Sequence, residues 1–171
     1  MHSNLLLLLS VLMIFTVGCE RETKMDLSSL DDETMLERIS DIAFSELEQN
    51  ADNLASLDEP YKTVAIIYGA QGIIDNGGFR YFFENDWPNN PDYSVFADAY
   101  ARIERTEAAD AIREAVATFD FKNPELYVNK RRAFINSRYN ENTFSVDGWN
   151  DCVCGDDQVW VNLAKWVREN Y

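Results

Sequence analysis

Two cysteines separated by one residue, Cys152 and Cys154, are the side chains of this 171-residue sequence best suited to chemistry. A Cys-x-Cys pair can chelate a soft metal, form a strained disulfide or exchange thiols. A metal site needs two further ligands, and no other Cys or His stands nearby at the usual spacing. In an oxidising compartment a structural pairing is favoured, with each other or with another chain. We therefore expect a stapled loop over residues 149–157.

Other residues suited to catalysis or metal binding are scarce. The single histidine is His2, so the rest of the chain lacks the commonest general base and a favoured metal ligand. The carboxylates between Asp147 and Asp157 do not follow the spacing of an EF-hand. We predict that the protein is not an enzyme, with no catalytic residues, no metal and no cofactor. A thiol enzyme acting through Cys152 and Cys154 is a distant third hypothesis.

The chain is strongly acidic, with 30 Asp and Glu against 15 Lys and Arg, a net charge of −15 and a pI near 4.3. Such a surface repels nucleic acid and anionic lipid headgroups, so an electrostatic partner should be a basic protein or a cation. The candidate acidic binding face lies at the start of the first expected helix and consists of Asp31, Asp32, Glu33, Glu37 and Asp41. The alternative is a solvated helix face that keeps the protein soluble, and the sequence alone favours that alternative.

A local basic cluster, Lys130-Arg131-Arg132, stands close in sequence to Lys122 and Arg138. Two specific uses are open to these side chains, namely ion pairs with the acidic helices and contact with headgroups beside the lipid anchor. Intramolecular or solvated use is the default for such a cluster. Nucleic acid is not an expected partner, because the chain as a whole is acidic.

An apolar leader opens the sequence. Leu5–Leu9 is an unbroken leucine run, and the apolar stretch continues to Val17. This stretch is too short to span a bilayer, which takes about 20 residues, and it has the length of a signal-peptide core. It ends in Thr16-Val17-Gly18-Cys19, which resembles the cleavage box of bacterial lipoproteins.

The leader predicts a lipoprotein-type signal peptide over residues 1–18, a lipid on Cys19 and a polar tether over residues 19–30. Membrane contact would then run through the lipid anchor on Cys19, in the bacterial cell envelope. Glu20 follows Cys19, and the absence of an aspartate there favours the periplasmic side of the outer membrane. The alternatives are an uncleaved anchor, or a translation start at Met25 whose product would stay in the cytoplasm.

Residues 31–171 are long enough for one domain and show helical periodicity along most of their length. No strand pair bounded by a hairpin turn is visible. Helices are expected to begin near Asp31, Pro60, Tyr93, Thr106, Asn123 and Asp157, with a short aromatic element over 79–83 and irregular chain over 139–156. The prediction is an all-α, single-domain, irregular bundle of about six or seven helices.

A corner is expected in the middle of the chain, at Asn76, Gly77, Gly78 and Phe79. The segment before it, Tyr61–Ile74, is apolar on nearly every side, which indicates a helix buried at the centre of the core. We expect this helix to end at the two glycines, because glycine adopts the left-handed conformation that closes helix C-termini. The aromatic residues that follow would then fold back over the helix end. The corner is therefore expected to be structural and not an active site.

The corner also carries a family resemblance. Asn76-Gly77-Gly78-Phe79 followed by Tyr81–Asn85 resembles the bacterial DNA-mimic-protein C-terminal domain family, long catalogued as a domain of unknown function. Phe96–Phe119 and Val159–Tyr171 are similar to later helices of the same family, so the resemblance covers about residues 31–171. It implies an all-helical bundle without known catalytic residues. It also implies a role in which carboxylates on rigid helices take the place of DNA phosphates in the groove of a DNA-binding protein.

The leading functional prediction is a lipid-anchored, acidic, non-enzymatic binding or scaffolding domain, whose partner is an unknown protein with a basic surface. The alternative is a cytoplasmic acidic DNA mimic, made from a start at Met25, that occupies a DNA-binding protein. The leader favours the first, because an exported lipoprotein rarely meets a transcription factor. The acidic composition suits both.

Overall fold

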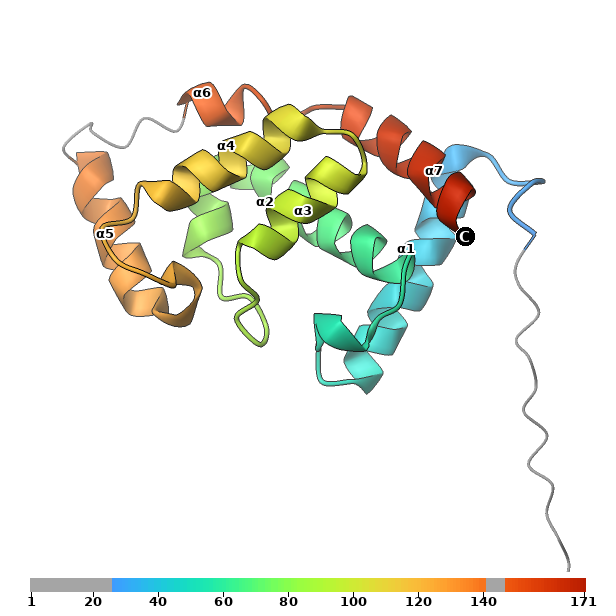
Figure 1. Cartoon of the computed structure of the whole chain (residues 1–171), viewed down its shortest axis with the longest axis horizontal. Coiled ribbons are helices and arrows are strands. Elements are labelled where there is room, and N and C mark those ends of the chain that lie inside the picture. The colour runs from blue at the N-terminus through green and yellow to red at the C-terminus, as the bar shows by residue number, and fades with distance from the viewer. Residues whose placement is uncertain (1–25, 141–146) are drawn as a thin grey trace, which may run out of the picture.

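The computed structural model describes residues 26–140 and 147–171, so the leader, Cys19 and Met25 lie outside the described residues (Figure 1). The regular elements within these ranges are α1 (Asp32–Gln49), α2 (Tyr61–Glu84), α3 (Ser94–Arg102), α4 (Thr106–Ala117), α5 (Val128–Asn140), α6 (Asp147–Asn150) and α7 (Gln158–Asn170), with 3-10 turns at Leu54–Ser56 and Pro124–Leu126. The predicted all-α single-domain bundle is confirmed, and seven α-helices agree with the predicted number. None of the described helices is long and apolar enough to cross a membrane.

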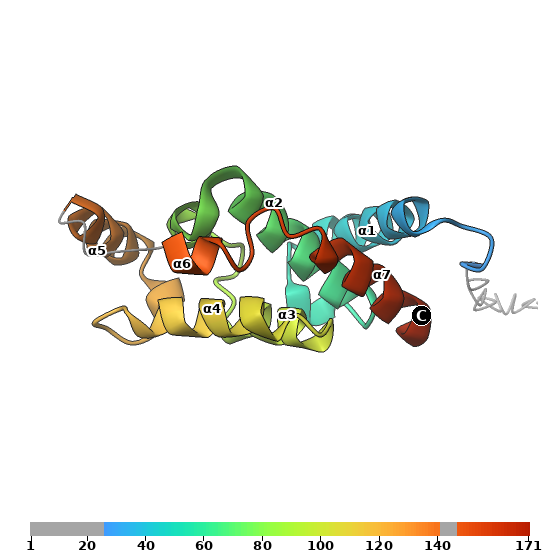
Figure 2. The ribbon, with the colours of Figure 1, turned by 90° about the horizontal axis from the view of Figure 1, so that it is seen from above.

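The helices are arranged around α2, which contacts α1, α3, α5 and α6. Helices α1 and α7 lie at one end of the molecule and α5 lies at the other (Figure 1). Seen from above, α3 and α4 form one layer, and α1 and α2 form another (Figure 2). The two ends of the molecule are therefore built from different parts of the chain.

Helix α1 begins where the sequence predicts, because Asp31 caps its first turn. The Asp31 carboxylate accepts hydrogen bonds from the backbone N–H of Thr34 at 2.8 Å and from the Thr34 hydroxyl at 2.9 Å. Apolar residues at helical spacing turn one face of α1 toward the core, and the buried ones are Met35, Leu36, Ile39, Ala43 and Leu47. The opposite face is left to its carboxylates and to water.

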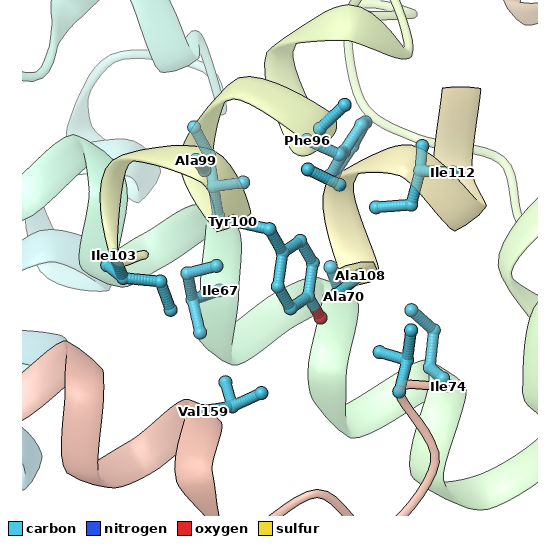
Figure 3. Close-up of a cluster of buried hydrophobic side chains, with 14 of the residues drawn as sticks. Ile67, Ala70, Ile74, Phe96, Ala99, Tyr100, Ile103, Ala108, Ile112 and Val159 are labelled. Carbon is cyan, nitrogen blue, oxygen red and sulfur yellow. The ribbon is translucent and has the colours of Figure 1, made fainter. Parts of the chain in front are cut away.

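The first half of α2 lies at the centre of the core, as predicted. Its Ile67 and Ile74 are fully buried, together with Tyr100 of α3, Ile112 of α4 and Val159 of α7 (Figure 3). Burying one such aliphatic side chain stabilises the fold by about 1.5–3 kcal/mol. This shared burial packs the distant α7 against the three consecutive helices α2, α3 and α4.

The predicted helix end at the two glycines is instead a kink inside α2. Gly78 has φ 64° and ψ −167°, which is not helical, yet the helix resumes at once and continues to Glu84. The expected separate aromatic element is therefore the second half of α2. Its Phe79, Phe82 and Phe83 are fully buried, while Tyr81 is 55% exposed. One left-handed glycine redirects the chain without stopping the helix, because the amide beyond the kink finds a partner outside α2.

Candidate protein-binding surface

Three of the five carboxylates in the predicted acidic face lie exposed on α1 at regular spacing. Glu33, Glu37 and Asp41 are exposed, and no ion pair to any of them is found within residues 26–140 and 147–171. They follow one another at four-residue spacing, so they share one side of the helix. Three carboxylates thus form a stripe that is open to a partner.

The two other predicted members of this face have structural contacts. Asp31 is the helix cap, and the pKa of its carboxyl is held below the usual 3.8, first of all by the hydrogen bond from the Thr34 backbone. Asp32 forms an ion pair with Arg168 of α7 at 2.6 Å. The predicted face therefore divides into two residues that hold the fold and three that are free to bind.

The charge density of α1 approaches that of a nucleic-acid strand. The helix has 18 residues, among them six carboxylates and one arginine. At about 1.5 Å per residue the helix is about 27 Å long, which gives about one carboxylate per 4.5 Å of axis. One strand of B-DNA carries about one phosphate per 3.4 Å. The six do not share one side, since Asp32 is paired with Arg168, and within the stripe successive carboxylates stand four residues, or about 6 Å, apart. A basic surface shaped for a polyanion therefore meets a row of charges on α1 that is about half as dense as one DNA strand.

The basic cluster is used inside the fold, and Arg131 is its centre. Arg131 is 1% exposed, and its guanidinium donates to the backbone carbonyls of Phe83, Asn85 and Pro124, the last at 2.6 Å. This intramolecular use agrees with the default expected for the cluster, although the partners of Arg131 are backbone carbonyls and not acidic side chains. Carbonyls at the C-terminal end of α2 lack helical partners, and a buried cation satisfies them.

The neighbours of Arg131 are also engaged within the chain. Arg132 donates to the carbonyl of Glu84 at 2.8 Å, and the Lys130 ammonium lies 4.0 Å from the centre of the Phe121 ring. The α5 end of the molecule therefore uses its positive charges to close α2 and to cover aromatic rings.

The kink in α2 depends on a contact with α6. The backbone N–H of Phe79 donates to the Asn150 side-chain oxygen at 2.9 Å, so Asn150 caps the second half of α2. A Cβ on Gly78 would lie 2.7 Å from that same oxygen, and a Cβ on Gly77 would lie 2.0 Å from the Tyr81 ring. The corner residues are therefore structural, and Asn76 donates within the same helix to the carbonyl of Gly72 at 2.6 Å.

The Cys-x-Cys segment packs against the same kink. Cys152 and Cys154 are both free, with the thiol of Cys154 donating to the carbonyl of Ile74 at 3.0 Å and that of Cys152 to the carbonyl of Gly148 at 3.3 Å. The two cysteines are therefore not joined to each other in a disulfide, and the segment over residues 149–157 is held by hydrogen bonds in place of the expected staple. Burial, and then the charge of Asp75, raises the pKa of the Cys154 thiol, which disfavours the thiolate that a nucleophile needs.

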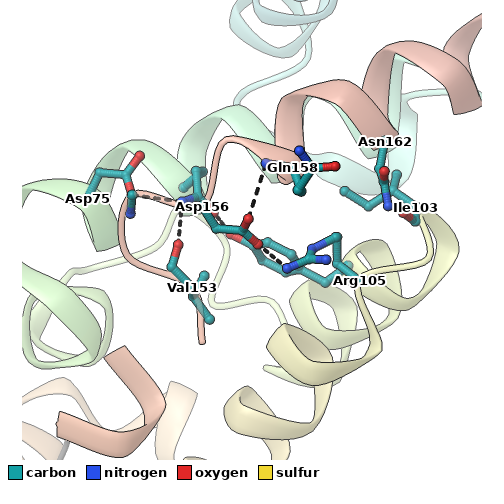
Figure 4. A network of polar contacts seen from close by, with 10 residues as sticks. Asp75, Ile103, Arg105, Val153, Asp156, Gln158 and Asn162 are labelled. Carbon is teal, nitrogen blue, oxygen red and sulfur yellow. Dashed lines mark hydrogen bonds and ion pairs between the residues drawn. The ribbon is translucent and has the colours of Figure 1, made fainter. Parts of the chain in front are cut away.

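A polar network ties the segment after the cysteines to α2 and to Arg105, the residue just before α4 (Figure 4). Asp75 accepts from the backbone N–H of Gly155 at 2.8 Å, and Asp156 pairs with Arg105. Asp156 also accepts from the backbone N–H of Gln158 at 3.1 Å, at the start of α7. The network therefore positions α7 beside the core.

Sequence reasoning missed the buried polar residues that hold the segment before α7 against α2 and α3. Gln71 is fully buried in α2, where it donates to the carbonyl of Val153 at 2.9 Å and accepts from the Tyr100 hydroxyl at 2.7 Å. Burial raises the pKa of the Tyr100 hydroxyl well above its usual value. A glutamine inside an apolar helix is a signal of a buried polar contact, because such a group must find partners. No local signal points to Arg131 or Asn150.

Metal-ligating side chains do not gather in the described residues. Within residues 26–140 and 147–171, no group of three or more His, Cys, Asp or Glu side chains is placed to hold a metal ion. The candidate surface therefore consists of exposed carboxylates on α1, and the buried polar contacts described above hold the fold.

The fold and this surface define an all-helical acidic domain whose charge is concentrated on one N-terminal helix. The chain belongs to the DMP19-like protein family, whose model matches residues 55–170. No curated protein and no solved structure matches the chain. The resemblance carried by the glycine corner is thus confirmed at the level of the family.

The matched region begins later than the resemblance predicts. Helix α1 precedes residue 55, so the predicted acidic face lies outside the part that matches the family model. Residues 31–54 carry eight Asp or Glu and one Arg, whereas residues 55–170 carry nineteen Asp or Glu and twelve Lys or Arg. The two regions have the same net charge although the second is far longer. The acidic face is therefore a property of α1 and its flanks.

Proposed function

We propose that this protein binds a basic DNA-binding protein and presents the carboxylates of α1 where that partner would otherwise bind DNA phosphates. The observation that carries the proposal is the stripe of Glu33, Glu37 and Asp41, exposed and without ion pairs in the described residues. Membership in the DMP19-like family, which comprises DNA-mimic proteins, supports DNA mimicry by the domain, whereas the assignment of that mimicry to α1 rests on the stripe alone, since the match begins at residue 55. The sequence-based alternative of an acidic DNA mimic is therefore preferred to an unspecified scaffolding role.

The physical basis of the mimicry is the rigidity of the charged row. Asp31 caps α1 and the buried face of the helix fixes it to the core, so its carboxylates keep their spacing without a partner. A preorganised row loses little conformational freedom on binding. A basic surface that binds DNA through phosphate contacts gains the same long-range attraction from α1, and that attraction is screened by salt.

Competition with DNA tests the proposal. A nucleoid protein of the HU type is bound to a fluorescent DNA duplex, and the full chain is added at several salt concentrations. We expect release of the duplex at low salt and a steep loss of competition as salt rises. Neutralising the stripe with Glu33→Gln, Glu37→Gln and Asp41→Asn should weaken competition about tenfold, if each exposed pair contributes about 0.5 kcal/mol.

A matched control removes the same number of charges elsewhere. Asp86, Glu107 and Asp120 are exposed and outside α1, and the variant Asp86→Asn, Glu107→Gln, Asp120→Asn changes the net charge by the same amount. We expect this variant to compete nearly as well as the wild type. Equal losses in the two variants would reduce the effect to net charge, and no competition by the wild-type chain would refute the mimicry.

For a chain that acts as a DNA mimic we propose a start at Met25, because the domain would then stay in the cytoplasm with a DNA-binding partner. The competing proposal is that the leader directs the chain to the bacterial envelope with a lipid on Cys19, which would separate it from such a partner. This proposal is supported by the sequence of residues 1–19 alone. Detergent-phase partitioning of the wild type and Cys19→Ala, with the mass of each product, tests it. An unprocessed wild type that stays in the aqueous phase refutes the lipid anchor.

A further inference from the structure

A groove lies beside the acidic stripe, between α1, α2 and α7. Its volume is ≈ 480 Å³, and its lining consists of Asp32, Glu33, Leu36, Glu37, Tyr68, Trp160 and Val161. Binding pockets for specific ligands commonly measure about 300–1,000 Å³. The groove therefore has the size of a binding site and stands next to the charges assigned to the partner.

The floor of the groove is apolar and open. Val161 of α7 is 55% exposed and adds an aliphatic side chain to the lining beside Leu36 and the two aromatic rings. The rings of Tyr68 and Trp160 meet edge to face, with centroids 4.9 Å apart. Large aromatic side chains held in this way provide a rigid contact surface at little entropic cost.

The rim of the groove is acidic on its α1 side. Asp32 is already paired with Arg168, whereas Glu33 and Glu37 have no ion pair within the described residues. Burial, together with the charge of Glu37, raises the pKa of the Tyr68 hydroxyl, so this group stays neutral beside the carboxylates. An apolar floor next to two free carboxylates is complementary to an apolar side chain flanked by positive charges.

We propose that the groove binds an amphipathic basic helix of the partner, whose apolar side chains rest on Leu36, Tyr68 and Val161 while its Lys or Arg side chains pair with Glu33 and Glu37. This inference rests on the proposed function and adds to it the kind of segment that is recognised. Apolar and cationic residues on neighbouring faces of one helix match the groove and its rim.

The groove would give the protein a selectivity that charge alone cannot give. Carboxylates attract every basic protein, and DNA phosphates offer no apolar floor. A partner with an exposed apolar side chain among its basic residues gains contact area on Tyr68 and Trp160, while a purely basic surface does not. Affinity should therefore keep a part that does not weaken with salt, because apolar burial is not screened.

Two variants that add the same charge separate docking in the groove from general electrostatic attraction. Val161→Asp places a carboxylate on the apolar floor, and Ser45→Asp extends the exposed stripe on α1 outside the groove lining. The probe is a helical lysine–leucine peptide of about 18 residues with its leucines at helical spacing, measured against a leucine-free lysine peptide of equal length. Binding to the full chain is followed by calorimetry at low and high salt.

The two variants are expected to change the affinity for the lysine–leucine peptide in opposite directions. Val161→Asp should raise its Kd about tenfold or more, although the variant adds an attractive charge. Ser45→Asp should leave the Kd unchanged or lower it up to about threefold. Val161→Ser, which adds no charge, should also weaken binding, with an unchanged dependence on salt. Thermal unfolding of each variant establishes that the fold is intact.

Three results would overturn the groove. If Val161→Asp strengthens binding as Ser45→Asp does, the attraction is electrostatic only. If the leucine-free peptide binds as tightly as the lysine–leucine peptide, the floor is not used. If Val161→Asp leaves the Kd of the peptide unchanged but lowers the mass of the assembly in light scattering, the groove binds a second copy of this chain. All three leave DNA competition by the wild type intact, so failure of the groove is distinguishable from failure of the proposed function.

Discussion

The two ends of the molecule are both charged, yet they use their charges in different ways (Figure 1). At one end, α1 carries six carboxylates and one arginine, and the exposed stripe has no ion pairs in the described residues. At the other end, residues 122–138 carry five Lys or Arg and one Glu. There Arg131 is buried against backbone carbonyls, and Arg132 closes the end of α2.

The difference shows that a run of charges in a sequence does not by itself indicate a binding surface. A guanidinium has five donors in a planar fork and can satisfy several carbonyls at once, which makes it useful inside a fold. A carboxylate accepts hydrogen bonds only, and the face of a capped helix offers it few donors. Charges that the fold does not satisfy are the ones left for a partner.

Removing Arg131 should have the largest effect. Arg131→Met leaves the buried carbonyls of Phe83, Asn85 and Pro124 without their donor, so we expect the free energy of unfolding to fall by about 3–5 kcal/mol. Urea denaturation followed by circular dichroism measures it. Lys130→Met is the control, with an expected change of less than about 1 kcal/mol. Equal small losses in both variants would mean that the α5 charges are as free as those of α1.

Altering the kink should have the next largest effect, because the kink sets where the last carbonyls of α2 meet Arg131. Gly78→Ala places a side chain at φ 64° and ψ −167°, a region restricted to glycine, beside the Asn150 oxygen. We expect a loss of about 2–3 kcal/mol in the same denaturation experiment.

Gly72 supplies the matched control for the kink. A Cβ at Gly72 meets nothing within 4 Å, and this glycine lies in the regular part of α2. Gly72→Ala should therefore stabilise the protein by about 0.5–1 kcal/mol through helix propensity. Similar behaviour of the two alanine variants would show that the backbone at Gly78 is not constrained.

Neutralising the free carboxylates should have a small effect of the opposite sign. Glu33, Glu37 and Asp41 repel one another at four-residue spacing, but Glu33 also lies in the first turn of α1, where a negative charge is stabilising. Replacing only Glu37 and Asp41 by Gln and Asn should therefore raise the free energy of unfolding by about 0.5 kcal/mol at low salt. The same variant should lose competition with DNA. Residues that lower the stability of the fold while they support binding to a partner are typical of a functional surface. A marked destabilisation would show instead that these carboxylates hold the fold.

The smallest expected effect concerns Asp31, whose carboxylate caps the first turn of α1. The pKa of Asp31 lies below 3.8 in the folded chain, so its contribution to stability is fully present above 3.8 and is lost as the pH falls through the lowered value. A titration of the Asp31 side chain by NMR measures this pKa directly. Thr34→Ala removes the hydroxyl donor and should move the pKa of Asp31 partly back up. If the pKa of Asp31 does not change in this variant, the hydrogen bond from the Thr34 backbone alone lowers it.

The fold was largely predictable, because helical periodicity, the start of the first helix near Asp31 and the apolar segment at residues 61–74 are local signals. The candidate acidic face was predictable in position but not in composition. Periodicity placed Asp31, Asp32, Glu33, Glu37 and Asp41 on one helix, while the cap and the pair with Arg168 became apparent only in the structure. The groove was not predictable, since Val161 is distant from α1 in sequence.

The sequence by itself determined the helical class, the acidic balance, the corner at Gly77 and Gly78, and the family to which the corner belongs. These properties follow from composition, spacing and backbone freedom, each of which acts over a few residues. Only the tertiary structure decided that α2 continues past Gly78, that Arg131 is buried, and that α7 and α2 form a groove beside the stripe on α1. Each of these depends on hydrogen bonds or packing between segments far apart in the chain, and the folded core alone brings those segments together.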